Sequence, residues 1–267
     1  MRKKFGQNFL INPSVRNSLA DALCAKKGDG IWEIGPGLGA MTELFLERGM
    51  KVRAFEIDAG FIGVLKRLFG GQENFSLVEG DVMKTWNKEA REGRRADFLS
   101  GNLPYNIAAS LLADMTEKGM FFSRIAVTVQ KETALRMAAS AGSPDYSSFS
   151  VLCASVYRVK PLMLIRPSSF YPAPNVDSMG VLLEKINPAI EYPKVFYPLV
   201  RSLFASRRKT VKNNLLVFIA SISGKACAKE ACADILRENS LSGKERAETL
   251  TADVFLSIAN SIANMRL

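Results

Sequence analysis

Hydrophobic residues in the first 130 positions occur in short runs that alternate with segments of helical spacing. Five mostly apolar runs are typical of buried strands, at 30–34, 51–57, 75–79, 96–100 and 124–129. Apolar residues recur every three to four positions at 41–47, 60–69 and 107–116, which predicts helices. Such alternation predicts an α/β fold, a mostly parallel sheet with helices on both faces. Ligands of these sheets bind beyond the carboxyl ends of the strands.

The pattern changes after residue 146. An apolar segment at 149–157 predicts a helix, and runs at 159–165 and 179–186 predict two further strands around a proline-rich loop. Beyond Pro188 and Pro193, helical periodicity returns at 195–204, 211–222, 229–238 and 252–265. We therefore expect two domains, a Rossmann-like α/β domain over residues 1–186 and a small all-helical domain over residues 187–267.

Composition narrows the class of protein. The 267 residues are 48% hydrophobic and 23% charged, which is typical of a globular chain with a packed core. No apolar run approaches the roughly 18 residues of a membrane span, and the basic N-terminus leads into no apolar signal region. The four cysteines are scattered without a C-x-x-C pair. We expect reduced thiols and a cytoplasmic protein that does not contact membranes.

The chain contains no histidine, although it has 36 Lys+Arg against 26 Asp+Glu and a net charge of +10. The absence of imidazole excludes Ser-His-Asp and Cys-His nucleophile systems, histidine metal ligands and a histidine general base. We expect no metal site. The positive charge suggests an acidic partner.

The basic residues are denser in the second predicted domain. Residues 187–267 carry 12 Lys+Arg and 7 Asp+Glu, so their net charge equals that of the much longer first part. The densest cluster is Arg207, Arg208, Lys209 and Lys212. It is either a solvated helix face or a patch that contacts nucleic-acid phosphates.

A glycine-rich loop follows the first predicted strand, in the sequence EIGPGLG at 33–39. Gly35 and Gly37 let a ligand approach the backbone, and the next helix N-terminus adds partial positive charge. Glu56 ends the second strand, in the position of a carboxylate that accepts from ribose hydroxyls. Asp81 ends the third strand and can accept from an adenine amino group. These residues predict a nucleoside-containing cofactor.

The same loop satisfies a second pattern. Gly35, Gly37 and Ala40 match the dinucleotide signature G-x-G-x-x-G/A, so an NAD enzyme remains an alternative at this point. The proline between the glycines favours an adenosyl cofactor without a pyrophosphate.

The fourth predicted strand ends in Asn102, Leu103, Pro104 and Tyr105, which favours methylation of a nucleobase amine. The lone pair of such an amine is delocalised into the ring. The Asn102 amide oxygen and a backbone carbonyl directed by Pro104 can accept from the amino group and localise that lone pair. Tyr105 can stack on a base taken out of its helix. This chemistry needs no histidine.

These motifs give the chain a resemblance to the KsgA family of small-subunit ribosomal RNA adenine dimethyltransferases. The resemblance covers essentially the whole length. Its motifs are FGQNFL at 5–10, EIGPG at 33–37, EID at 56–58, GD at 80–81, NLPYNI at 102–107, FYPAPNVDS at 170–178 and SRRKT at 206–210. Met41, where the family usually has leucine, is a conservative departure. The segment before Phe5 is shorter than in many relatives.

The resemblance implies S-adenosyl-L-methionine as methyl donor and dimethylation of two adjacent adenosines near the 3′ end of small-subunit (16S) ribosomal RNA, in assembling 30S particles. It implies a site for that donor at Asn8, Leu10, Gly35, Gly37, Glu56, Asp81 and Asn102. Asn102 to Tyr105 would form the catalytic loop, and Phe170 would contact the other side of the target base. The basic cluster would contact RNA.

Two other functions stay open. An Erm-type enzyme that methylates large-subunit RNA would share the cofactor motifs, although such relatives more often have Ile in place of Leu103 and lack the RRKT helix. A ribosome-assembly binding factor with vestigial catalysis would keep the basic domain. The intact loop with Glu56, Asp81 and Asn102 argues against loss of activity. Because the chain shows no heptads, we expect a monomer.

Overall fold

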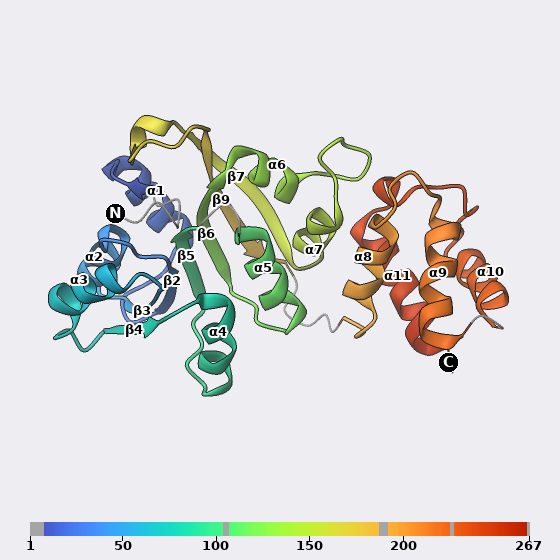
Figure 1. Cartoon of the computed structure of the whole chain (residues 1–267), viewed down its shortest axis with the longest axis horizontal. Helices are drawn as coiled ribbons and strands as arrows, with labels where there is room; N and C mark the ends of the chain where they lie inside the picture. Colours follow the sequence, from blue (N-terminus) through green and yellow to red (C-terminus); the bar gives the residue numbers. More distant parts are fainter. Residues whose placement is uncertain (1–7, 104–106, 187–191, 225–226, 266–267) are drawn as a thin grey trace. The chain divides into compact units, whose positions relative to one another are not determined.

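The computed structural model describes residues 8–103, 107–186, 192–224 and 227–265 (Figure 1). Contacts between residues divide the chain into two compact units. The first comprises Met1–Leu135 and Arg158–Ile186, and the second comprises Arg136–Tyr157 and Asn187–Leu267. None of the described helices is both long and apolar enough to cross a membrane.

The sheet lies in the first unit. Its order over the described residues is β4-β3-β2-β5-β6-β9-β7. The strands are β2 (Gly30–Ile34), β3 (Lys51–Glu56), β4 (Phe75–Glu79), β5 (Phe98–Asn102), β6 (Arg124–Gln130), β7 (Tyr157–Ile165) and β9 (Ser178–Lys185). The first five strands in this order, from β4 through β3, β2 and β5 to β6, pair in parallel with their neighbours. Strand β9 pairs antiparallel with β6. The predicted α/β fold with a mostly parallel sheet is confirmed.

The order of the strands reverses between β2 and β5. From β2 the chain builds outward through β3 to β4, and it then returns to the other side of β2 with β5 and β6. Such a reversal leaves a crevice at the carboxyl ends of the two central strands, where ligands of open α/β sheets bind. The glycine loop follows β2, and Asn102 is the last residue of β5. The topology therefore brings two separate sequence motifs to one place.

Helices cover both faces of the sheet, as the alternating pattern predicts (Figure 1). Side chains of α1 (Pro13–Leu23), α2 (Ala40–Glu47) and α3 (Ala59–Phe69) share one apolar cluster with Ile31 and Val52 of the sheet. Residues next to Ile31 and Val52 along their strands point to the other face of the sheet. On that side Trp32 packs against Phe55, with ring centroids 4.9 Å apart. The helices there are α4 (Val82–Arg91) and α5 (Ala108–Glu117), and α6 (Lys131–Ala138) follows β6.

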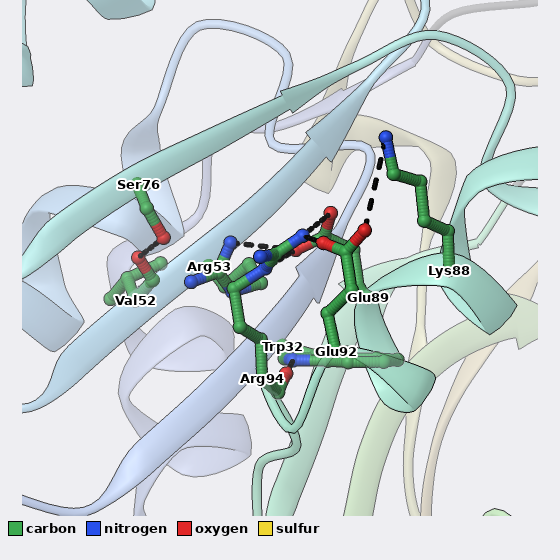
Figure 2. Close-up of polar contacts among 8 residues, drawn as sticks. All are labelled: Trp32, Val52, Arg53, Ser76, Lys88, Glu89, Glu92 and Arg94. Atoms are coloured by element: carbon green, nitrogen blue, oxygen red, sulfur yellow. Dashed lines mark hydrogen bonds and ion pairs between the residues drawn. The ribbon is translucent and has the colours of Figure 1, made fainter.

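A polar cluster fastens the end of α4 to β3 (Figure 2). Glu89 of α4 is only 7% exposed and accepts from two arginines. Nη1 of Arg53 lies 2.8 Å from Oε2, and Arg94 contacts both carboxylate oxygens at 2.6 and 2.8 Å. The Trp32 indole N–H donates to the Arg94 carbonyl at 3.1 Å. This cluster anchors α4, whose first turn follows Asp81.

The second unit is helical over its described residues. Its helices are α7 (Ser148–Val156), α8 (Phe196–Phe204), α9 (Val211–Ser223), α10 (Ala228–Glu238) and α11 (Ala252–Asn264). Phe204 stacks on Phe255 with centroids 5.7 Å apart, and the Tyr146 hydroxyl donates to the Leu250 carbonyl at 2.8 Å. These contacts build a separate apolar core.

Residues 136–157 join this helical unit, whereas the sequence analysis assigned them to the α/β domain. The reason is the composition of α7, in which every residue from Phe149 to Val156 except Ala154 is buried. A helix that is apolar on all sides needs other helices around it. Helix α7 packs against α8 and α11. The helical unit is therefore assembled from two separate segments of the chain.

Candidate functional site

The glycine loop after β2 is tied to the end of β3. Gly35 and Gly37 have φ angles of +68° and +58°, in the left-handed region that favours glycine. A Cβ at Gly37 would lie 2.8 Å from Cε1 of Phe9, so a side chain has no room there. The Gly37 N–H donates to Oε2 of Glu56 at 3.1 Å. The loop and the expected ribose acceptor thus form one connected unit.

Glu56 is a buried carboxylate held by backbone N–H groups. Its Oε1 accepts from Ile57 at 2.8 Å and from Asp58 at 2.9 Å. Burial raises the pKa of Glu56, and the N–H groups oppose that shift. Among the described residues, no lysine or arginine contributes to the shift. The carboxylate is positioned by backbone dipoles, and the described residues supply it with no counter-cation.

Glu33 is a second buried carboxyl group at this edge, and the sequence analysis did not select it as a site residue. It is 2% exposed, and the Thr42 hydroxyl donates to its Oε2 at 2.6 Å. Burial raises the pKa of Glu33 to about 7, and the charge of Glu56 acts in the same direction. A glutamate inside the apolar strand GIWEI was the available signal, because buried strands rarely contain one without a reason.

Asp81 stands at the start of α4, where its side chain caps the helix. Oδ1 accepts from the Met83 N–H at 2.9 Å. The preceding Gly80 N–H donates to the Glu56 carbonyl at 2.8 Å, so the ends of β3 and β4 are linked. Glu56 and Asp81 therefore lie at the carboxyl ends of neighbouring strands, as the sequence predicted.

The two polar atoms of the Asn102 side chain differ in their hydrogen bonding. Its Nδ2 donates to the Asn8 carbonyl at 2.6 Å. Its Oδ1 is buried and has no hydrogen-bond partner among the residues that the structure describes. Leu103 is 1% exposed, and its N–H donates to the Thr128 carbonyl at 3.0 Å. A buried amide oxygen without a donor is uncommon in folded proteins and marks a place where a ligand group fits.

Two members of the predicted catalytic loop, Pro104 and Tyr105, lie outside the described residues. The position of Asn102 is nevertheless defined, because its strand is paired on both sides. Gly101 pairs with Ile34 of β2, and Asn102 pairs with Thr128 of β6. The Thr128 hydroxyl is also buried, and it has no hydrogen-bond partner in the ranges that the structure describes.

A two-stranded ribbon carries Leu10 and Phe170. Strand β1 (Phe9–Leu10) pairs antiparallel with β8 (Phe170–Tyr171), so that Leu10 lies opposite Phe170. Both side chains are buried in the core of the first unit, and Phe170 is 3% exposed. The alternate residue, Tyr171, is 66% exposed. In this structure the Phe170 ring therefore packs in the core, and Tyr171 is the aromatic side chain that faces solvent.

The basic cluster belongs to the second unit. Arg207, Arg208 and Lys209 lie in the turn between α8 and α9, and Lys212 lies in the first turn of α9; all four are exposed. Asn214 fastens this turn by donating to the carbonyls of Leu203 and Ser206. Arg207 pairs with Glu248 at 3.1 Å.

The sheet topology and this edge define a Rossmann-like methyltransferase. A family model described as ribosomal RNA adenine dimethylase matches residues 1–263. The chain belongs to that family, and the predicted resemblance to the KsgA family is confirmed. The chain is accordingly a methyltransferase enzyme.

Relatives cover almost the whole chain. The ribosomal RNA small subunit methyltransferase A of Treponema denticola is 44% identical over 269 residues, which span 99% of this chain and 90% of that protein. The protein of the same name from Treponema pallidum strain Nichols is 40% identical, over 98% of this chain and 91% of that protein.

Two solved structures are similar over most of the chain. A dimethyladenosine transferase from Plasmodium falciparum has a TM-score of 0.80 at 27% identity and covers 94% of this chain and 95% of its own. The 23S rRNA methyltransferase ErmE has a TM-score of 0.66 at 18% identity, over 95% and 99%, and shares the fold.

Proposed function

We propose that this enzyme dimethylates N6 of two adjacent adenosines near the 3′ end of small-subunit (16S) ribosomal RNA, in assembling 30S particles, with S-adenosyl-L-methionine as methyl donor. The relatives named for small-subunit RNA methylation support the substrate. The observation that carries the chemistry is the buried Oδ1 of Asn102, at the carboxyl end of β5 beside β2, which has no partner within the described part of the chain.

The residues at the carboxyl edge suit the proposed donor. Glu56 presents a carboxylate that no cation of the described residues neutralises, which suits a pair of ribose hydroxyls, and Gly37 leaves the loop without a side chain. We assign the donor site to Asn8, Leu10, Gly35, Gly37, Glu56, Asp81 and Asn102. When bound, S-adenosyl-L-methionine supplies an electrophilic methyl group.

The proposed role of Asn102 follows from its side-chain oxygen, Oδ1, which can accept a hydrogen bond. In our proposal Oδ1 accepts one N–H of the adenine amino group, and the Leu103 carbonyl, directed by Pro104, accepts the other. Two acceptors outside the ring plane favour a more tetrahedral nitrogen whose lone pair is available for in-line attack. Catalysis then comes from positioning and from exclusion of water, and the displaced proton passes to solvent.

Stacking of the base is assigned to Tyr105 and Phe170. Because Phe170 is 3% exposed here, its part in the proposal requires RNA binding to uncover the ring. A Phe170→Leu variant separates the two roles. Because the ring is buried, the substitution lowers stability in either case, and the KM for RNA separates the roles: loss of base contact would raise this KM, whereas a packing role alone would leave it near its original value.

The basic cluster provides the proposed RNA contacts outside the catalytic edge. Exposed guanidinium and ammonium groups release counterions when they bind phosphates, so affinity that depends on them falls as salt rises. We assign this role to Arg207, Arg208, Lys209 and Lys212, and we propose a monomeric cytoplasmic enzyme. A variant with all four changed to Gln should bind small-subunit particles with a weaker salt dependence.

The decisive test uses unmethylated small-subunit particles and methyl-labelled donor. We expect label in N6,N6-dimethyladenosine, and we expect Asn102→Ala to lower the rate by about 100-fold or more, as the loss of a preorganised polar group in an active site does. Asn260→Ala, on the exposed surface of α11, is the matched control and should retain full activity.

The other outcomes identify the alternatives. Label in large-subunit RNA alone would indicate an Erm-type enzyme and reject the proposed substrate. Particle binding without label in the unmodified protein would indicate an assembly factor. Nicotinamide binding in calorimetry without binding of the methyl donor would indicate a dehydrogenase.

A further inference from the structure

The contact between Asn102 and Asn8 joins residues that are far apart in the sequence. The 2.6 Å hydrogen bond runs from the Asn102 side-chain nitrogen to a backbone carbonyl. A carbonyl oxygen can only accept, so the amide atom beside it must be the nitrogen. The amide oxygen must therefore point the other way, where it is buried and no described residue donates to it.

This orientation matters because the two ends of an asparagine amide are almost the same size. Rotation by half a turn exchanges them, and steric packing hardly distinguishes the two states. In the rotated state, Oδ1 would face the Asn8 carbonyl oxygen, and an amino donor would face the substrate. That state cannot accept from an adenine amino group. Only a fixed polar partner selects the productive state.

The Asn8 carbonyl is fixed because the chain beside it is paired and packed. Leu10 is 7% exposed in the core and pairs with Phe170 across the ribbon. The Ile11 N–H donates to the Ser169 carbonyl at 2.9 Å. The Phe9 ring packs edge-on against Phe61 with centroids 5.3 Å apart.

We propose that the backbone carbonyl of Asn8, held by the β1–β8 ribbon, is a positioning group that orients the Asn102 amide for catalysis. The N-terminal segment thus acts on the reacting amine through Asn102, in addition to its proposed contact with the methyl donor. This inference rests on the proposed role of Asn102. It makes the segment at 8–11 a determinant of the chemical step as well as of binding.

A backbone substitution tests the carbonyl directly. Replacing Phe9 by phenyllactic acid turns the Asn8–Phe9 amide into an ester, whose carbonyl is a weaker acceptor. The matched control is phenyllactic acid at Phe75, the first residue of β4, which removes the N–H donated to the Gln72 carbonyl and weakens the Asn74 carbonyl. Both proteins carry the same substitution and lose one backbone N–H, but only the first weakens the partner of Asn102.

The expected result separates chemistry from binding. At saturating methyl donor, the ester at position 9 should lower kcat about five- to tenfold, the effect of one weakened hydrogen bond. Donor affinity and the KM for RNA should stay within about twofold. The ester at position 75 should keep kcat within about twofold of the unmodified enzyme. The 15N signal of the Asn102 side-chain amide should shift only with the ester at position 9.

Equal losses of kcat in the two esters, or no loss at position 9, would overturn the positioning role. The Asn102→Ala variant distinguishes this failure from failure of the proposed function. If Asn102→Ala remains active, the proposed catalytic role of Asn102 is rejected. If Asn102→Ala is inactive and the ester at position 9 is fully active, only the positioning inference is rejected.

Discussion

Two regions of the first unit bury glutamates to a similar extent but shift the pKa values of these glutamates in opposite directions. At the polar cluster on α4, Glu89 is 7% exposed and lies between Arg53 and Arg94 (Figure 2). Hydrogen bonds from Arg94 lower its pKa. At the carboxyl edge, Glu33 and Glu56 are 2% and 5% exposed, and burial raises the pKa of both.

The difference lies in the partners. Glu89 has two cations within hydrogen-bond distance, so its charge is satisfied within the protein. Glu33 and Glu56 receive only hydroxyl and backbone N–H donors from the described residues. A buried carboxylate is expensive unless something else stabilises its charge. The first cluster is satisfied within the protein, and the second supports our proposal that this edge binds a ligand.

The largest expected effect concerns Glu33 and pH. Because its folded-state pKa is about 7 and the ordinary value is 4.5, the unfolded chain releases this proton at lower pH than the folded chain. The contribution to stability is fully present below pH 4.5 and is lost as pH rises through 7. We expect the free energy of unfolding to fall by up to about 3 kcal/mol across this window.

Glu33→Gln checks this prediction, because a neutral amide mimics the protonated carboxyl. Urea unfolding of the protein without ligands at pH 5, 6, 7 and 8 should show a clearly smaller fall for the variant. The remaining slope should include Glu56, whose pKa is also raised. Parallel pH profiles for the two proteins would contradict the assignment.

The next effect concerns cofactor affinity at Glu56. Glu56→Gln removes the carboxylate that we assign to the ribose hydroxyls. Hydrogen bonds to charged groups contribute about 1.5–3 kcal/mol, so we expect the Kd for S-adenosyl-L-methionine to rise roughly 10- to 100-fold in calorimetry. An unchanged Kd would remove Glu56 from the site and weaken the comparison between the two regions.

The smallest effect concerns stability at Glu89. Glu89→Gln makes the same chemical change as Glu56→Gln, but it removes the carboxylate partner of Arg53 and leaves Arg94 paired with Glu92. Because both arginines are partly exposed to water, we expect a loss of about 1–2 kcal/mol rather than that of a fully buried pair. Cofactor affinity measured below the unfolding transition should not change. A matching loss of affinity would show that the cluster on α4 also shapes the ligand site.

Several elements escaped the sequence analysis although their signals were present. Helix α1 begins with the pair Asn12 and Pro13, in which Asn12 caps the first turn. Asp81 was interpreted only as a ligand acceptor, yet it also caps α4. Strands β1 and β8 have two residues each, too short for any periodicity to indicate them.

The sequence could predict the residues of the candidate site that belong to a motif at the end of a single strand. Gly35, Glu56, Asp81 and Asn102 could be selected because parallel strands bring their carboxyl ends to one edge. Contacts that depend on pairing between distant segments could not be predicted from the sequence. The hydrogen bond from Asn102 to Asn8 and the burial of Phe170 opposite Leu10 both depend on the ribbon.

The sequence by itself determined the α/β class, the glycine loop, the acidic strand ends, the asparagine loop and the basic cluster, because local periodicity and motif spacing encode them. Only the tertiary structure decided which end of the Asn102 amide donates to Asn8, which glutamates receive no cation from the described residues, and that residues 136–157 pack with the C-terminal helices. These features depend on contacts between residues far apart in the chain. Burial and pairing at such contacts, rather than residue type alone, set the charge and orientation of each group.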